Sequence, residues 1–154
     1  KDEVQPFLSP AFGILLLAQP GWQENSDERY FQVIDPVTGT QFTASGYENP
    51  NIGLEQWAEA RLGMLAEGMP FMKRLCPPYP VSGNGWQGIA IECRGTFPGD
   101  DKESHYLVLC LLSEQRLISF TVTASVEAFR ANEALYRDVL KTRLLLAPAM
   151  QFSN

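Results

Sequence analysis

The sole histidine, His105, is the side chain best suited to acid–base chemistry, because imidazole titrates near neutral pH. It stands at the start of an apolar run, shortly after a glycine-containing acidic loop. A catalytic histidine needs a nucleophile or a metal-binding motif beside it, and the sequence contains neither GxSxG nor HExxH. We therefore interpret His105 as an ordinary surface or strand-end residue and predict no catalytic residue.

The acidic loop before His105 could in principle hold a metal ion. Asp100, Asp101 and Glu103 supply its carboxylates. Calcium takes about six to eight oxygen ligands from an organised loop, and the spacing here does not match an EF-hand. The sequence also lacks the GxxxxGK[ST] pattern of a nucleotide-binding P-loop. We predict a solvated acidic turn, no metal site and no cofactor.

The composition is that of a folded, acidic domain. The chain has 154 residues, 45% of them hydrophobic and 19% charged, and its net charge is -6. A charged share below the usual level of about 25% argues against intrinsic disorder. A nucleic acid or an anionic membrane surface would be repelled by the negative charge. We therefore expect no nucleic-acid partner.

Cysteine usage and apolar runs bear on the compartment. Cys76, Cys93 and Cys110 match no zinc pattern, so a reducing compartment is the simplest interpretation, with one disulfide plus a free thiol as the alternative. The longest apolar run, residues 12–18, is too short to span a bilayer. We expect a cytoplasmic location, or a periplasmic one if a signal peptide precedes Lys1.

Hydrophobic periodicity predicts a mixed α and β domain. We expect strands at 12–19, 30–35, 40–47, 87–94, 105–112 and 116–124, with a short edge strand in the proline-rich stretch 69–80. A helix is predicted over 54–67, and a second begins after Ser125, which can cap it. The apolar stripe of the second helix is formed by Val126, Phe129, Tyr136, Leu140 and Leu144. Residues 1–11 are expected to be a lead-in, 12–147 one domain and 148–154 a tail.

Alternation along three consecutive strands predicts two different sheet faces. One face is apolar, and both helices should pack against it; its members are Ile89, Ile91, Cys93, Leu107, Leu109, Leu111, Ile118, Phe120 and Val122. The same alignment puts Cys93 and Cys110 on opposite faces, so we expect no disulfide between them.

The other face of these strands is amphipathic. Its candidate partner-binding residues are Glu92, Arg94, Tyr106, Val108, Cys110, Leu112, Thr121 and Thr123. One interpretation is a partly solvated face, or one covered by the amino-terminal segment, since exposed apolar residues are common. The alternative is a binding surface for an extended or helical ligand.

Several short motifs resemble a known family. They are the Pro20-Gly21-Trp22-Gln23 turn, the Asp35-Pro36 hairpin, the Leu54-Glu55-Gln56-Trp57 helix start, the Gly85-Trp86-Gln87 lead into a strand, and the strand 117–123 before a helix that begins Ser125-Val126-Glu127. The chain from about residue 12 to 147 resembles the PsbP-like family, which includes Mog-type, bacterial DcrB-like and type VI secretion effector-associated (Eag) chaperone proteins. This resemblance implies an α+β fold, with an antiparallel sheet of about six strands flanked by helices as an α/β/α sandwich, and a non-enzymatic binding role.

The leading hypothesis is a protein-binding adaptor or chaperone, with a hydrophobic segment of a bacterial secretion effector as the expected partner. The alternatives are a periplasmic or lipid-anchored DcrB-like envelope protein and an immunity protein, whose acidic surface would suit a basic toxin. A homodimer is a further alternative. No membrane span and no enzymatic activity are expected.

Overall fold

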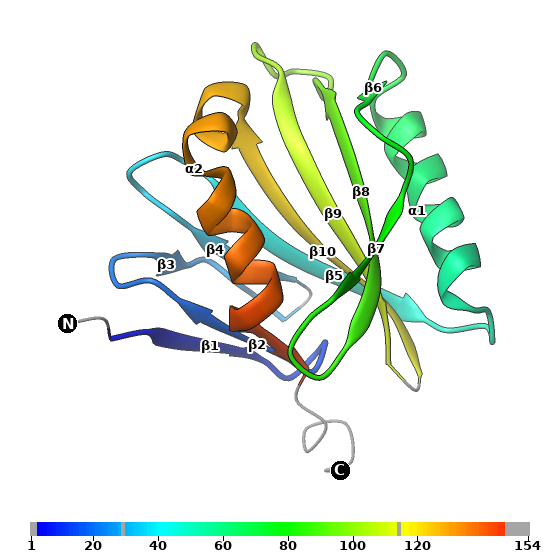
Figure 1. Ribbon diagram of the computed structural model, residues 1–154, viewed down its shortest axis with the longest axis horizontal. Helices are drawn as coiled ribbons and strands as arrows, with labels where there is room; N and C mark the ends of the chain where they lie inside the picture. The colour runs from blue at the N-terminus through cyan, green and yellow to red at the C-terminus, as the bar shows by residue number, and fades with distance from the viewer. Residues whose placement is uncertain (1–2, 29, 114, 147–154) are drawn as a thin grey trace.

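The computed structural model describes residues 3–28, 30–113 and 115–146. Within these residues, eight strands form one large antiparallel sheet (Figure 1), in the order β3-β4-β5-β10-β9-β8-β6, with β7 also paired to β8. Its strands are β3 (Gln23–Glu24), β4 (Phe31–Ile34), β5 (Gln41–Glu48), β6 (Lys73–Arg74), β7 (Tyr79–Ser82), β8 (Gln87–Gly95), β9 (Ser104–Leu112) and β10 (Arg116–Ser125). The sheet exceeds the expected six strands because it includes the two-residue strand β3 and, at the proline-rich stretch, both β6 and β7, although the predicted strand at 12–19 lies in a separate sheet.

The hairpin between β4 and β5 forms where the sequence predicted it. The carboxylate of Asp35 accepts hydrogen bonds from the backbone N–H of Val37, at 2.9 Å, and from the hydroxyl of Thr38, at 3.0 Å. Gly39 closes the turn with a φ of 78°, a conformation that glycine adopts without strain. Local side-chain bonds and one glycine therefore determine this connection.

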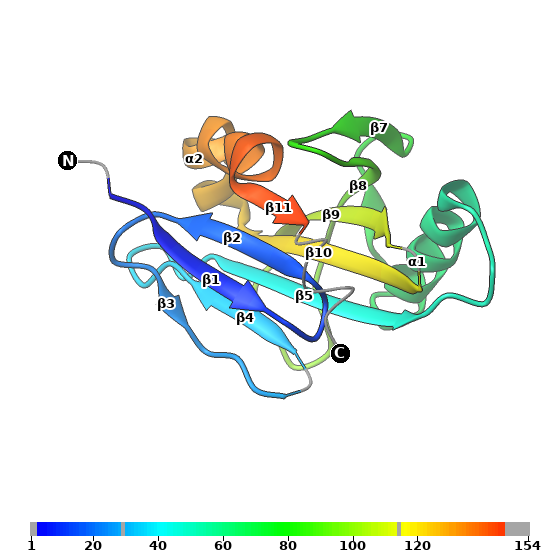
Figure 2. The ribbon, with the colours of Figure 1, turned by 90° about the horizontal axis from the view of Figure 1, so that it is seen from below.

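The two α-helices of the described chain lie on opposite faces of the large sheet (Figure 2). Helix α1 (Leu54–Gly68) buries Trp57, Ala58 and Leu65 on one face, and α2 (Val126–Asp138) buries Phe129 and Tyr136 on the other. The prediction that both helices pack against the same face is wrong. The central strands are apolar on both sides, so each face needs its own cover.

Strand β8 is turned over relative to the predicted alignment. Ile91 pairs with Val108 and Cys93 with Tyr106, so these residues face α1. Ala90 pairs with Leu109 and faces α2. The predicted apolar face is correct for β9 and β10 but wrong for β8, because a shift of one residue exchanges the two faces of a strand.

A second sheet joins the two ends of the described chain. Within that part of the chain, β1 (Gln5–Ser9), β2 (Ile14–Ala18) and β11 (Leu144–Leu146) form three antiparallel strands in the order β1-β2-β11. The lead-in predicted for 1–11 thus contains a strand. The tail at 148–154 lies outside the described residues.

The end of the second helix also differs from the prediction. Ser125 caps α2 as expected, since its hydroxyl accepts from the backbone N–H of Ala128 at 3.0 Å. The helix then changes to a π-helical turn, Val139–Arg143, before β11 begins. Leu144, predicted in the helical stripe, is a buried strand residue.

Candidate functional site

A buried ion cluster around Glu92 joins β7, β8, β9 and α2. Arg137 of α2 donates two hydrogen bonds to this carboxylate, from Nη1 to Oε2 at 3.0 Å and from Nη2 to Oε1 at 3.2 Å. His105 of β9 donates from Nε2 to Oε1 at 3.0 Å, and the hydroxyl of Tyr79 donates to Oε2. The carboxylate thus accepts hydrogen bonds from one cationic side chain and from two further donors, as a buried charge requires.

The aromatic ring of Phe129 supports the cluster from α2. His105 stacks on this ring with 3.5 Å between ring centroids and 4° between planes, and the guanidinium of Arg137 lies 5.7 Å from the same centroid. His105 is 6% exposed, so it lies near a strand end but is not a surface residue. The interpretation as a surface residue is therefore wrong, because Glu92 satisfies the imidazole in the interior.

Burial and hydrogen bonding shift the pKa values of Glu92 and Tyr79 away from neutral pH. Burial alone would raise the pKa of Glu92, but hydrogen bonds from His105, Arg137 and Tyr79 outweigh it and hold that pKa at about 2. Burial, together with the hydrogen bond to Glu92, raises the pKa of Tyr79 to about 12. General acid–base catalysis works best with a pKa near the operating pH. Glu92 and Tyr79 are therefore suited to holding elements together rather than to proton transfer.

The low pKa of Glu92 predicts a loss of stability in acid. Its ordinary pKa is 4.5 and its folded pKa is about 2, so its contribution is present above about pH 4.5 and is lost as the pH falls toward 2. Urea unfolding between about pH 5 and pH 2 should show this decline in the wild type and a shallower one in Glu92→Gln. Equal pH dependence in the two proteins would contradict the assignment.

A groove lies between α1 and β7, beside the first residues of β8. Figure 1 shows β7 and α1 at the same edge of the sheet, and residues of both line the groove. The groove has a volume of about 510 Å³ and is lined by Leu54, Glu55, Ala58, Glu59, Leu62, Pro78, Tyr79, Pro80, Val81, Ser82, Gln87, Gly88 and Ile89. Most of these side chains are apolar, and the volume lies within the range of about 300–1,000 Å³ typical of ligand sites.

Tyr79 connects the groove to the ion cluster. It lines the groove, while its hydroxyl donates to Glu92 and accepts from Nη1 of Arg137 at 3.1 Å. Among the described strands, β7 pairs with β8 alone, through the register Tyr79↔Ala90 to Ser82↔Gln87. The cluster therefore adds side-chain bonds to an edge strand that forms one wall of the groove.

Comparisons with known proteins identify the fold. No protein-family model and no curated protein sequence matches the chain. The cyanobacterial PsbP protein of Synechocystis sp. PCC 6803 has a similar structure, with a TM-score of 0.70 and 14% identity over 95% of this chain and 94% of that one. The chain has the PsbP-like fold. The predicted fold class, an α+β protein with an antiparallel sheet and flanking helices, is confirmed.

Two further structures share this PsbP-like fold. LpqN of Mycobacterium tuberculosis, involved in cell envelope biogenesis, matches with a TM-score of 0.64 and 13% identity, over 96% of this chain and 87% of that one. The Ran-binding protein Mog1p of Saccharomyces cerevisiae matches with a TM-score of 0.57 and 9% identity, over 89% and 85%. At these identities the similarity concerns the fold.

The eight residues predicted to bind a partner are divided between the two faces of the large sheet. Glu92 and Arg94 face α2, and the remaining six face α1. Five of the eight are buried: Glu92, Tyr106, Val108, Cys110 and Thr121; the other three, Arg94, Leu112 and Thr123, are half-buried. The prediction that they share one face is wrong, because it rested on the shifted β8. Their contact with a partner stays a prediction.

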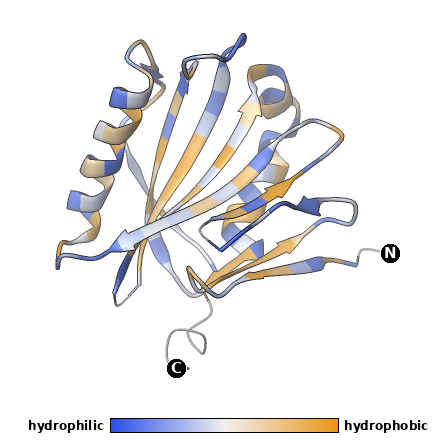
Figure 3. Ribbon diagram, turned by 180° about the vertical axis from the view of Figure 1, so that it is seen from behind, coloured by the Kyte–Doolittle hydropathy of each residue, from blue (hydrophilic) through white to orange (hydrophobic). Residues whose placement is uncertain are grey.

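Two of the predicted residues border an open hollow beside α1. Tyr106 and Thr123 line it together with Asp100 and Asp101 of the acidic loop, and its volume is about 600 Å³. Seen from behind, α1 lies beside this part of the sheet rather than over it (Figure 3). Across the described ranges, no group of three or more His, Cys, Asp or Glu side chains is placed to hold a metal ion. No described helix is long and apolar enough to cross a bilayer.

The glycines at 83–88 have the GxGxxG spacing of a dinucleotide-binding turn. In such a turn the glycines lead into a helix, whose N-terminus holds the pyrophosphate. Here the run leads into strand β8, and the N–H of Gly83 donates to the carbonyl of Trp86 at 2.9 Å. Gly83 and Gly85 lie in a tight turn between β7 and β8, and Gly88 lies within β8, a geometry unsuited to a dinucleotide.

The two buried cysteines lie on the same face, contrary to the prediction. Cys93 pairs with Tyr106 and Cys110 with Ile89, so they are offset by four positions along their strands. At about 3.4 Å per residue this offset exceeds the reach of a disulfide, and both thiols are free. Burial raises the pKa of Cys93 to about 11 and that of Cys110 to about 12. Both are therefore poor nucleophiles at neutral pH.

Proposed function

We propose that this protein is a non-enzymatic binding protein that holds an apolar segment of another polypeptide in the groove between α1 and β7. The observation that carries the proposal is the apolar lining of this groove, including Leu54, Leu62 and Ile89. Clefts of this size, with an apolar surface and a few polar groups, are the usual form of a binding site.

The chemistry of the buried groups supports binding over catalysis. Glu92 stays charged and fully hydrogen-bonded at neutral pH, and the buried thiols stay protonated. A nucleophile or general base in the groove would have to come from its lining residues. Glu55 and Glu59 are its ionisable carboxylates, and both are exposed on the helix.

The finer proposal is an adaptor or chaperone in the cytoplasm whose partner is a hydrophobic segment of a secreted effector. Its support is the apolar groove together with a fold found in a Ran-binding protein, Mog1p. A second candidate is an envelope protein, supported by the shared fold with LpqN, which is involved in cell envelope biogenesis. Detection of the native protein in a periplasmic or membrane fraction would favour the second candidate.

Replacing Leu62 with Gln should weaken binding of an apolar peptide about tenfold, because Gln keeps helix propensity but removes apolar surface from the groove. The probe is a labelled peptide selected from an array of short apolar sequences, and the measurement is fluorescence anisotropy.

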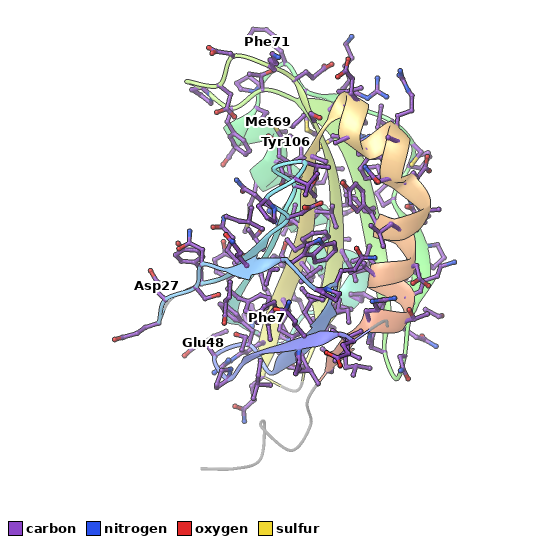
Figure 4. All side chains as sticks on the ribbon, turned by 90° about the vertical axis from the view of Figure 1, so that its left-hand side faces the viewer. Phe7, Asp27, Glu48, Met69, Phe71 and Tyr106 are labelled. Atoms are coloured by element: carbon purple, nitrogen blue, oxygen red, sulfur yellow. The ribbon has the colours of Figure 1, made fainter. Side chains whose placement is uncertain are left out.

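Phe71 provides the matched control for Leu62→Gln. Its side chain is 94% exposed in the loop after α1 (Figure 4) and does not line the groove. Phe71→Ser should leave peptide affinity unchanged. Unaltered affinity in Leu62→Gln, or a loss in Phe71→Ser, would contradict binding in the groove.

A further inference from the structure

We infer that the groove between α1 and β7 selects apolar segments that carry a lysine or arginine, and that Glu55 and Glu59 recognise the cation. This inference rests on the proposed function and adds the chemical class of the partner. It assigns a role in specificity to two carboxylates that the fold does not require.

The two glutamates are placed together on the rim of the groove. They stand four residues apart on α1, a spacing that puts both on the same side of a helix. Ala58 lies between the two glutamates in the sequence and Leu62 follows them, and both belong to the apolar wall of the groove. A cation beside an apolar stretch of a bound peptide would therefore meet the carboxylates while its neighbours occupy the groove.

Both carboxylates are available to a ligand. Within the part of the chain that the structure describes, neither glutamate forms an ion pair or a side-chain hydrogen bond. The residues that line the groove include no Lys, Arg or His. A ligand cation would therefore meet two negative charges and no positive charge there.

Part of the opposite wall of the groove lacks backbone hydrogen-bond donors. Pro78 and Pro80 of this wall have no backbone N–H, so their backbone can accept hydrogen bonds but cannot donate them. Ammonium and guanidinium groups are donors without acceptors, which matches the carbonyls of these two prolines as well as the carboxylates. The net charge of -6 also attracts a cationic segment over longer distances.

The test uses two peptides that differ in one charged group. One is the apolar peptide with a central lysine, and the other carries norleucine there, which keeps the methylene chain and removes the ammonium. The wild type should bind the lysine peptide more tightly, and the preference should decline as salt rises. The double variant Glu55→Gln/Glu59→Gln should bind the lysine peptide about fivefold more weakly and prefer neither peptide.

Glu67 supplies a matched control on the same helix. It is exposed and does not line the groove, so Glu67→Gln should keep the preference for lysine. Circular dichroism would verify that each variant is folded.

Three outcomes would overturn the inference. If the double variant keeps the lysine preference while Leu62→Gln weakens both peptides, the groove binds apolar segments without selecting a cation, and the proposed function stands. If Leu62→Gln also binds both peptides normally, the proposed function fails with the inference. If sedimentation shows a dimer that Leu62→Gln dissociates, a second copy of the chain occupies the groove instead.

Discussion

Replacing Glu92 with Gln should lower the free energy of unfolding by about 3 kcal/mol, because it removes one partner of a buried ion pair. The glutamine amide would face donors from Arg137, His105 and Tyr79, with one carbonyl oxygen left to accept. The side chain of Arg137 is 34% exposed and can turn partly to water, so we expect the lower end of the range for buried pairs. Urea denaturation at neutral pH measures the change.

Glu133 allows a control on the same guanidinium. Its carboxylate lies 2.8 Å from Nη2 of Arg137, but its side chain is 50% exposed. Glu133→Gln should therefore change the free energy of unfolding by less than about 1 kcal/mol, as exposed pairs do. If the two variants are destabilised equally, burial is not what makes Glu92 important, and the cluster does not hold the sheet to α2.

The cluster also has a consequence for the groove. Tyr79 reaches Glu92 from β7, so removing the carboxylate should loosen this wall as well as the packing of α2. Edge strands with prolines have few backbone bonds to hold them in place. The Glu92 carboxylate therefore helps to hold β7, which forms one wall of the groove, in place.

The parts of the fold that depend on neighbouring residues were predictable from the sequence. The β4–β5 hairpin forms at Asp35-Pro36, where it was expected, and Asp35 and Gly39 hold its short turn. The apolar side of α1 follows from helical spacing, and Trp57 and Leu65 of that side are buried. In each case the signal lies within a few residues of the structure that it determines.

The register of β8 was not predictable from alternation. Ile89 and Ile91 form a regular apolar series, but Gly88 before them and Ala90 between them are buried as well. A strand that is covered on both sides has a nearly continuous apolar sequence. Alternation therefore does not show which side of β8 packs against α1 and which against α2. The pairing with β9 decides the register, and that pairing links residues of distant sequence position.

The ion cluster was missed for a related reason. A charged residue in a strand usually indicates a solvated face, because carboxylates are rarely buried without a partner. The main partner of Glu92 is Arg137, which is 45 residues away in the sequence. A signal was present nonetheless. Glu92 is a single carboxylate within an apolar stretch, and a one-residue shift of β8 places it on the same face as His105, the sole histidine.

Replacing Trp57 with Ala should have the largest effect of any variant considered, a loss of about 4 kcal/mol in the free energy of unfolding. Trp57 is fully buried between α1 and the sheet, and its ring packs against the ring of Tyr47 with 5.8 Å between centroids. Its Nε1–H donates to the carbonyl of Ile118 at 2.9 Å. The substitution therefore leaves a cavity and removes a donor where α1 meets β10.

Trp57→Phe separates the two contributions. Phenylalanine keeps most of the apolar volume and loses the donor, so the expected loss is about 1.5 kcal/mol. Equal losses in the two variants would show that the hydrogen bond, rather than packing, holds α1 to the sheet. Because α1 forms one wall of the groove, peptide affinity should fall with the stability of this contact: Trp57→Ala should weaken binding more than Trp57→Phe, although neither substitution touches the lining. A folded Trp57→Ala protein with full affinity would mean that the groove does not depend on α1.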